Sequence, residues 1–158
     1  MNYLNNISWT INSPISNLKI INSDHYEEFD EKYVDEEDDY YYSNEVNEIV
    51  INRIFSTCGI ILKIPIQRFN QNQIDLKLDG PVTVKNILET LYHFYNIEEV
   101  NMDILKNIPD DCFHYVRNMK TKVKRGKVMH WIDLMGGKIF FEGFRRIGEN
   151  TYYLNLGS

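Results

Sequence analysis

Alanine is missing from this chain of 158 residues, and cysteine occurs only twice. Asparagine, isoleucine, tyrosine and lysine, whose codons contain little G or C, are abundant. This composition is typical of AT-rich genomes, such as those of amoebal giant viruses and some protists. Cys58 and Cys112 lie too far apart to suggest a disulfide framework, so we expect a reducing compartment such as the cytoplasm. For a viral protein, the virion or the viral factory is the corresponding location.

Long apolar runs are also missing. No stretch approaches the roughly 18 residues that a membrane span needs. The N-terminal segment "MNYLNNISW" has no basic region of the kind that begins a signal peptide. We therefore expect no membrane partner. The hydrophobic share of 43% and the charged share of 25% are ordinary for a globular protein, so the length suits one domain with one core.

Charge is divided unevenly along the chain. Residues 24–48 contain 12 acids and one base, Lys32. Residues 1–50 carry those 12 acids and two bases, a net charge of −10, whereas residues 51–158 carry 11 acids and 15 bases, a net charge of +4. Because the total is −6, bulk charge alone would not select nucleic acid or an anionic membrane as the partner.

The acidic segment has two alternative interpretations. An acidic stretch with few aliphatic residues usually stays disordered, because it cannot bury enough apolar surface to offset chain entropy. This one also carries aromatic rings, which could dock on the body of the protein. Its tyrosines could instead be phosphorylated, serve as a short recognition motif or belong to a solubilising linker. The rings are those of Tyr26, Phe29, Tyr33, Tyr40, Tyr41 and Tyr42.

The remaining sequence alternates between strand and helix patterns. The clearest helix follows Thr83, which is the expected N-cap, and one of its faces is apolar at Val84, Ile87, Leu88, Leu91 and Tyr95. Shorter helices are expected at 101–107 and from Pro109 toward Lys122. β-branched residues predict strands at 7–11, 17–21, 49–66 with a turn at 57–59, 73–79 and 151–156.

The stretch "VMHWIDLMGGKIFFEGF" predicts a β-hairpin that turns at Gly136 and Gly137, because a two-residue primed turn needs positive φ at its centre. Its register places Leu134 opposite Ile139. Large apolar side chains then fall on both faces, although a strand with one solvated face should alternate. Either the chain's own helices or acidic arm cover the second face, or a partner does. The first face holds Val128, Ile132, Leu134, Ile139 and Phe141, and the second holds Trp131, Phe140 and Phe144.

Three segments carry a family resemblance: "VTVKNILETLYHF" at 82–94, "IDLMGGKIFFEGF" at 132–144 and "YYLNLG" at 152–157. In this order they resemble a domain family of unknown function that is common in mushroom-forming fungi. The resemblance covers about two-thirds of the chain and implies a compact α+β domain, but it implies no catalytic residue. The acidic, tyrosine-rich segment departs from the family pattern, so the resemblance implies nothing about that segment's function.

Two groups of residues are candidates for binding. The basic segment 120–127 could hold a nucleic-acid strand by charge, with exposed rings stacking on bases; the alternative is a solvated helix end whose lysines favour the helix dipole. No metal-ligand spacing and no nucleophile signature are present, so we expect no metal, no cofactor and no catalytic residue. The candidate nucleic-acid contacts are Lys120, Lys122, Lys124, Arg125, Lys127, Arg145 and Arg146, and the candidate partner contacts are Trp131, Phe140, Phe144, Tyr40, Tyr41 and Tyr42.

Together these patterns predict a single α+β domain in which an antiparallel sheet packs against two or three helices. Residues 1–23 contribute N-terminal strands, residues 24–48 form an acidic, tyrosine-rich insertion that is a candidate for disorder, and residues 49–158 form the main body. The leading hypothesis is a non-enzymatic interaction module with a protein partner, such as a viral accessory or assembly protein. The alternative is a nucleic-acid-associated protein that uses residues 120–127.

Overall fold

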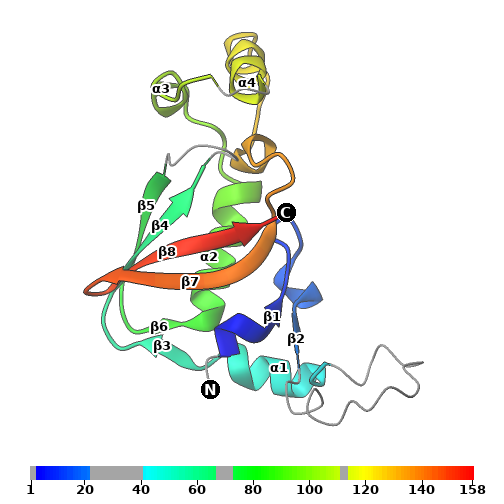
Figure 1. Ribbon diagram of the computed structural model, residues 1–158, viewed down its shortest axis with the longest axis vertical. Coiled ribbons are helices and arrows are strands. Elements are labelled where there is room, and N and C mark those ends of the chain that lie inside the picture. Colours follow the sequence, from blue (N-terminus) through cyan, green and yellow to red (C-terminus); the bar gives the residue numbers. More distant parts are fainter. Residues whose placement is uncertain (1–2, 22–40, 67–72, 111–113) are drawn as a thin grey trace, which may run out of the picture.

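The computed structural model describes residues 3–21, 41–66, 73–110 and 114–158. These residues form an α+β domain, so the predicted fold class is confirmed. In Figure 1 the long helix α2 (Val84–Asn96) lies behind a four-stranded sheet. The other elements are, in chain order, η1 (Tyr3–Asn6), β1 (Ile7–Ser8), η2 (Ile15–Asn17), β2 (Lys19–Ile20), α1 (Asn44–Ile51), β3 (Ile54–Ser56), β4 (Ile60–Pro65), β5 (Gln73–Leu78), β6 (Val82–Thr83), α3 (Met102–Leu105), α4 (Tyr115–Lys124), η5 (Trp131–Leu134), β7 (Phe140–Gly148) and β8 (Thr151–Gly157).

The main sheet has the strand order β5-β4-β8-β7. β5 pairs antiparallel with β4, and β7 pairs antiparallel with β8. The two central strands, β4 and β8, are parallel, so the sheet is mixed rather than wholly antiparallel as predicted. Central strands are the most enclosed in such a sheet, and alternate residues of both are buried in the core. These residues are Ile60, Leu62, Ile64, Leu154 and Leu156.

Helix α2 forms where the sequence predicts it. Thr83 and Asn86 make a reciprocal capping box: the Thr83 hydroxyl accepts from the Asn86 N–H at 3.1 Å, and the Asn86 side chain accepts from the Thr83 N–H at 3.0 Å. The apolar face repeats with helical period and is buried throughout. Its buried residues are Val84, Ile87, Leu88, Leu91, Phe94 and Tyr95.

The N-terminal strands pair with each other and then extend the main sheet. β1 and β2 are antiparallel, with Ile7 opposite Ile20, as the two predicted strand segments suggest. The next residues lie along the outer side of β7. The Ile11 N–H donates to the Ile139 carbonyl, and the Phe141 N–H donates to the Trp9 carbonyl, both at 2.9 Å. This pairing covers the first part of the β7 edge.

The predicted hairpin around Gly136 and Gly137 is wrong. Trp131–Leu134 is the 3₁₀ helix η5, and β7 instead pairs with β8 across a turn at Asn150, which has a φ of 52°. The Asp133 carboxylate accepts from the His130 N–H at 3.0 Å, and the Asp133 N–H donates to the His130 carbonyl. These local bonds favour a helical turn over a strand. The predicted apolar face is also incorrect in part, since Val128 is exposed.

Two predicted boundaries are also corrected. The sequence predicts a strand at residues 49–51, but these residues belong to α1, whose N-cap is Ser43 and whose inner face buries Val50 and Ile51. Helical spacing of these apolar residues outweighs their β-branched preference for strands. The strands that follow, β3 and β4, flank the predicted turn at 57–59. The predicted helix from Pro109 is described only from residue 114, and its regular part is α4.

The described end of the predicted acidic insertion is part of the fold. Tyr41 forms a β-bridge with Ile21, and the Tyr42 N–H donates to the Ile20 carbonyl at 2.9 Å. Residues 44–48 begin α1, and Asn47 on that helix is buried. Residues 22–40 lie outside the described residues, so the alternatives of a docked or a free arm stay predictions for that part.

Candidate functional site

The three aromatic residues of the predicted partner face have three different environments. Trp131 is only 2% exposed, and its ring stacks on Phe94 of α2 with centroids 5.5 Å apart. Phe144 is half-buried and lies 5.3 Å from Phe141, measured between ring centroids. Phe140 is 52% exposed. The structure therefore uses Trp131 as a core residue and leaves Phe140 as the ring that a partner could reach.

The described tyrosines of the predicted recognition motif are engaged with the N-terminal strands. The Lys19 ammonium lies 4.8 Å from the centroid of the Tyr41 ring, a cation–π distance. Tyr42 is half-buried and packs against the core. Tyr40 lies outside the described residues.

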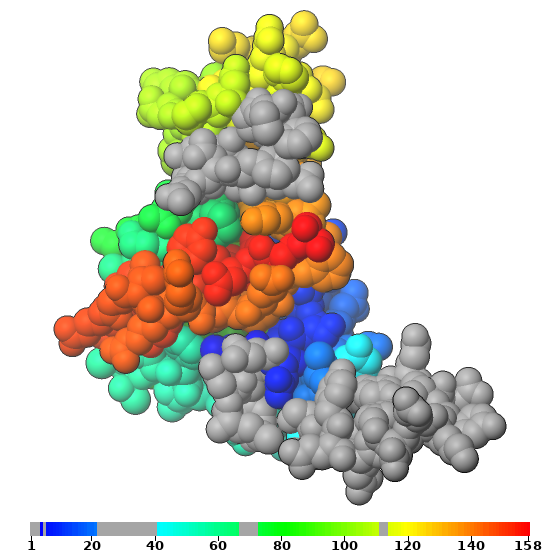
Figure 2. All heavy atoms as spheres, viewed as in Figure 1, coloured from blue at the N-terminus to red at the C-terminus, as the bar shows by residue number. Residues whose placement is uncertain are grey.

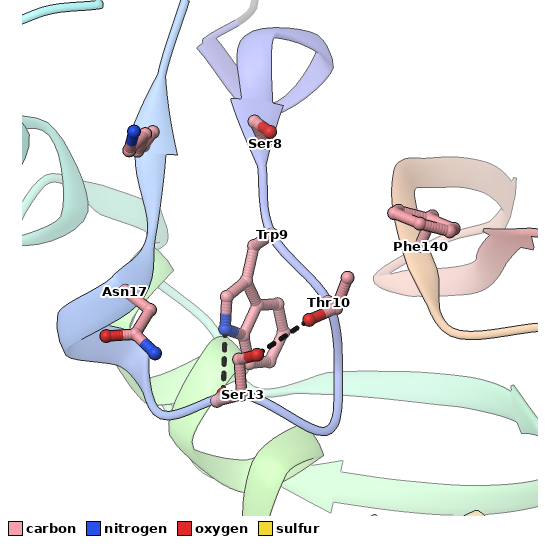
Figure 3. Close-up of a pocket in the computed structure, with 7 residues that line it drawn as sticks. Ser8, Trp9, Thr10, Ser13, Asn17 and Phe140 are labelled. Atoms are coloured by element: carbon pink, nitrogen blue, oxygen red, sulfur yellow. Dashed lines mark hydrogen bonds between the residues drawn. The ribbon is translucent and has the colours of Figure 1, made fainter.

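A shallow hollow of about 170 Å³ lies beside Phe140. Figure 3 shows Phe140 on β7 across from the loop that carries Thr10 and Ser13. The Trp9 indole N–H donates to the Ser13 carbonyl at 2.9 Å, and the hydroxyls of Thr10 and Ser13 are 2.8 Å apart. These bonds fix the loop. The lining is mostly polar apart from two rings and consists of Ser8, Trp9, Thr10, Ser13, Asn17, Lys19 and Phe140.

Helix α4 is amphipathic and lies at one end of the molecule, at the top in Figures 1 and 2. It packs on α3 and η5, and its inner face buries Val116 and Met119. The residues between these positions point to the opposite side because the helix repeats every 3.6 residues. The surface outside the buried stripe carries Arg117, Asn118, Thr121, Lys122 and Lys124, all of them exposed. Arg117 and Lys124 share one flank of this surface, and Lys122 lies on the other flank.

The end of α4 is locked by its own backbone. The Gly126 N–H donates to the Val123 carbonyl at 3.0 Å, and the Lys127 N–H donates to the Lys122 carbonyl at 3.1 Å. These two bonds are those of a Schellman motif, and Gly126 supplies the required left-handed residue with a φ of 78°. Arg125 and Lys127 are therefore held next to the last turn of the helix.

The cations of the basic segment divide into one structural residue and an exposed group. The Lys120 ammonium donates to the Ile108 carbonyl and lies 3.3 Å from an Asp110 carboxylate oxygen, so it ties α4 to the preceding loop. The other cations are exposed, and within the described residues none forms an ion pair. We call this group the α4 basic surface; its members are Arg117, Lys122, Lys124, Arg125 and Lys127.

Arg117 belongs to the α4 basic surface but is absent from the predicted contacts. The sequence suggests a cluster that begins at Lys120, because the bases are densest from there. Helical periodicity was the available signal, since Arg117 is seven residues before Lys124 and so lies on the same side of the helix.

Arg145 and Arg146 do not join the α4 basic surface. The Arg145 guanidinium lies 5.7 Å from the centroid of the Tyr153 ring, and the Arg146 Nε donates to the Gly148 carbonyl at 3.2 Å. Both arginines lie on β7 toward its turn with β8, which Figure 1 places well away from α4. The structure therefore does not combine the two predicted basic groups into one groove.

Among the described residues, no three His, Cys, Asp or Glu side chains are grouped so as to hold a metal ion. Cys58 is exposed and has a free thiol, while Cys112 lies outside the described residues. Tyr95 donates its hydroxyl to the Pro65 carbonyl, and burial raises the pKa of this phenol well above its ordinary value.

None of the described helices has the length and apolar character needed to span a membrane. Comparison with known proteins found no matching family model, no matching curated protein and no matching solved structure. The resemblance to the fungal domain family therefore stays a prediction.

Proposed function

We propose that this protein is a non-enzymatic interaction module that binds nucleic acid through the α4 basic surface. The observation that carries the proposal is the density of exposed cations there. Residues 114–127 contain six bases and no acid, and only Lys120 has an ion pair within the described residues. A monomeric fold gains little from placing unpaired like charges side by side, so a polyanionic partner accounts for this surface better than stability does.

Phosphate recognition suits the geometry of this helix. Lysine and arginine side chains spread over the exposed surface of the helix can contact several phosphates, and binding gains free energy from the release of condensed counterions. The Schellman motif at Gly126 keeps Arg125 and Lys127 close to the helix, which lowers the entropy cost of ordering them. The chain's net charge is −6, but residues 51–158, which include the α4 basic surface, carry 11 acids and 15 bases, a net charge of +4. At physiological salt, exposed charges act on one another over only about 8 Å, so the local charge matters more than the total.

A simpler explanation accounts for part of the arrangement. Cations in the last turn of a helix stabilise its dipole, and Lys122, Lys124 and Arg125 are placed for that role. It does not account for Arg117, which lies in the first turn, where a positive charge is unfavourable. Phosphate binding therefore explains the position of Arg117, whereas stabilisation of the helix dipole does not.

The proposal is tested by fluorescence anisotropy with labelled single- and double-stranded DNA and RNA at about 50 mM salt, a condition that strengthens phosphate contacts. We expect a binding constant whose logarithm falls linearly with the logarithm of salt concentration. For duplex DNA the slope should be about −4.5 if each of the five cations of the α4 basic surface neutralises one phosphate, because roughly 0.9 counterions are released for each phosphate neutralised.

The matched variants compare two groups of three cations. Changing Lys122, Lys124 and Arg125 together to Glu should abolish most of the binding. Changing Lys85, Arg145 and Arg146 together to Glu alters the net charge equally and should leave binding nearly intact. Equal losses in both variants, or no binding of any nucleic acid by the original chain at low salt, would remove the proposal.

A protein partner is the second candidate, and the exposed ring of Phe140 beside a hollow favours it. An exposed phenylalanine next to a polar pocket suits a contact in which a partner covers the ring and hydrogen-bonds to Thr10 or Ser13. The test is affinity purification from the native host, with and without nuclease, using the original chain and Phe140→Ser. A partner that resists nuclease and is lost from Phe140→Ser would favour this candidate, and a viral accessory role would then be examined through that partner's identity.

A further inference from the structure

The two edges of the main sheet are protected to different degrees. The β7 edge pairs with residues 9–11 over its first part, and its register is broken by irregularities near Glu142 and Ile147. Within the described part of the chain, β5 has neither protection. Its register with β4 is continuous over six residues, it contains no proline, and no described residue pairs with its outer backbone groups. An unpaired, regular edge strand is a ready template for another strand.

The apolar residues of β5 are incompletely covered. Ile74, Leu76 and Leu78 are half-buried. Their partners across the β4–β5 ladder are Ile64, Leu62 and Ile60, none of which is more than 2% exposed. The core therefore continues sideways from β4 to β5 and ends at an edge that no described residue pairs. Figure 1 shows β5 as the outermost strand of the sheet on this side.

The sequence of this edge is self-complementary. Two β5 strands can pair antiparallel around a two-fold axis at Leu76. A residue that precedes Leu76 by a given number of positions then faces the residue that follows Leu76 by the same number in the second copy. Leu76 then faces Leu76, and Ile74 faces Leu78 of the second copy. On the other side of the sheet, Asp75 faces Lys77 of the second copy, and this ion pair occurs twice because the arrangement has two-fold symmetry.

Neighbouring registers are unfavourable. Centring the pair on Asp75 would place two aspartates directly opposite each other, and centring it on Lys77 would place two lysines opposite each other. Like charges directly across a strand pair are destabilising. A register shifted by one residue from the Leu76-centred pairing would place Leu76 opposite Asp75 or Lys77. It would bring apolar and polar side chains onto the same side of the sheet. Among the registers centred on residues 75 to 77, the Leu76-centred one therefore satisfies both the charges and the apolar side chains.

We propose that β5 pairs with β5 of a second copy of this chain in the Leu76-centred antiparallel register, so that two four-stranded sheets join into one continuous sheet. The occupant of this edge is a second copy because its charge pattern complements itself. Asp75 already lies 2.8 Å from the Lys63 ammonium of its own chain, which orders the carboxylate on the side of the sheet where Lys77 of the second copy would lie.

Sedimentation analysis of the full chain over a concentration series tests the proposal. The original protein should show a monomer–dimer equilibrium. In a dimer of Lys77→Glu, Asp75 of each copy would face the new glutamate of the other copy, so two acid–acid pairs form. In a dimer of Asp75→Lys, the new lysine of each copy would face Lys77 of the other copy, so two lysine–lysine pairs form. Each variant alone should dimerise about tenfold or more weakly, since two attractive pairs become repulsive.

Mixing the two variants is the decisive step. In a mixed dimer, the acid introduced at position 77 of one copy would face the lysine introduced at position 75 of the other. On the other side of the two-fold axis, the unchanged Asp75 and Lys77 would face each other, so both pairs are again opposite in charge. A 1:1 mixture should therefore form heterodimers about as well as the original chain forms dimers. Lys85→Glu, which makes the same charge change on α2 as Lys77→Glu makes on β5, should leave the equilibrium unmoved, and thermal unfolding should confirm that all variants fold.

Three results would overturn the proposal. The first is an original chain that stays monomeric up to its highest soluble concentration, which would leave this edge to a strand from a different protein or to solvent. The second is a dimer that neither charge variant weakens, which would place the interface elsewhere. The third is a mixture that associates no better than either variant alone, which would exclude the Leu76-centred register.

Discussion

Helices α2 and α4 are both amphipathic, but they occupy opposite situations in the fold. α2 buries six residues, starts at a reciprocal capping box and lies against the main sheet. α4 buries only Val116 and Met119, has no side-chain cap at its start and lies at one end of the molecule. The first helix is specified by the core that it completes. The second packs on α3 and η5 and exposes several cations to solvent.

This difference separates stability from binding. Substitutions around α2 should lower the free energy of unfolding, because apolar burial is the main favourable term in folding. Substitutions on the α4 basic surface should change binding to a polyanion and leave folding nearly unchanged, since exposed charges contribute little to stability.

The largest effect is expected at Trp131, whose ring stacks on α2. Trp131→Ala should lower the free energy of unfolding by about 4 kcal/mol, because it leaves a large cavity against Phe94. Chemical denaturation followed by circular dichroism measures this. Phe140→Ala is the control from the same aromatic stretch and should cost little, since that ring is already half in water. Similar losses in both variants would contradict the division of this stretch into core and surface.

A smaller loss is expected at the N-cap of α2. Thr83→Ala removes one half of the capping box and should cost about 1 kcal/mol. Thr121→Ala on α4 is the control, because the Thr121 hydroxyl donates to the Arg117 carbonyl within the helix and caps nothing. Thermal unfolding of both variants compares them. A loss of stability in Thr121→Ala as large as that in Thr83→Ala would show that the fold depends on the side-chain bonds of α4 as much as on those of α2.

Asn47 on α1, which packs beside α2, should give a gain rather than a loss. Its side chain is buried and its Oδ1 has no hydrogen-bond partner among the residues that the structure describes. Asn47→Leu removes that unsatisfied group at similar volume and should raise the free energy of unfolding by about 1 kcal/mol. The exposed Asn118 on α4 provides the control substitution Asn118→Leu, which should have no such effect. A clear decrease in the melting temperature of Asn47→Leu would indicate that Asn47 has a polar partner.

The smallest stability effect is expected on the α4 basic surface. The combined Glu variant of Lys122, Lys124 and Arg125 should unfold within about 0.5 kcal/mol of the original chain, as is usual for surface substitutions. The same variant should lose most nucleic-acid binding. Measuring both properties on one preparation tests the separation, and a large loss of stability would mean that these cations hold the fold together.

The sequence predicts α2 well because its information is local. Thr83 supplies a cap, and the apolar residues from Val84 to Tyr95 repeat with a single period. The prediction for the stretch around η5 is wrong because its local pattern is ambiguous. It is apolar in every register, so alternation cannot be distinguished from helical spacing. The Gly136–Gly137 pair suits several kinds of turn, since both residues have positive φ here without joining paired strands.

The candidate site was predictable only as a set of charges. The sequence shows a basic cluster near residue 120, but it does not show that Lys120 is tied to Ile108 and Asp110, while Lys122 and Lys124 are exposed and form no ion pair with a described residue. Nor does it show that Arg145 lies far from α4. These facts depend on how loops and strands pack across the fold, and such contacts leave no local pattern.

The most direct test of the α4 proposal is a titration of the isotope-labelled protein with a short oligonucleotide, followed by backbone amide chemical shifts in NMR spectra. The largest shifts are predicted at residues 117–127, with small or no shifts at the turn between β7 and β8. Shifts confined to that turn or to the hollow beside Phe140, or no shifts at low salt, would contradict the account.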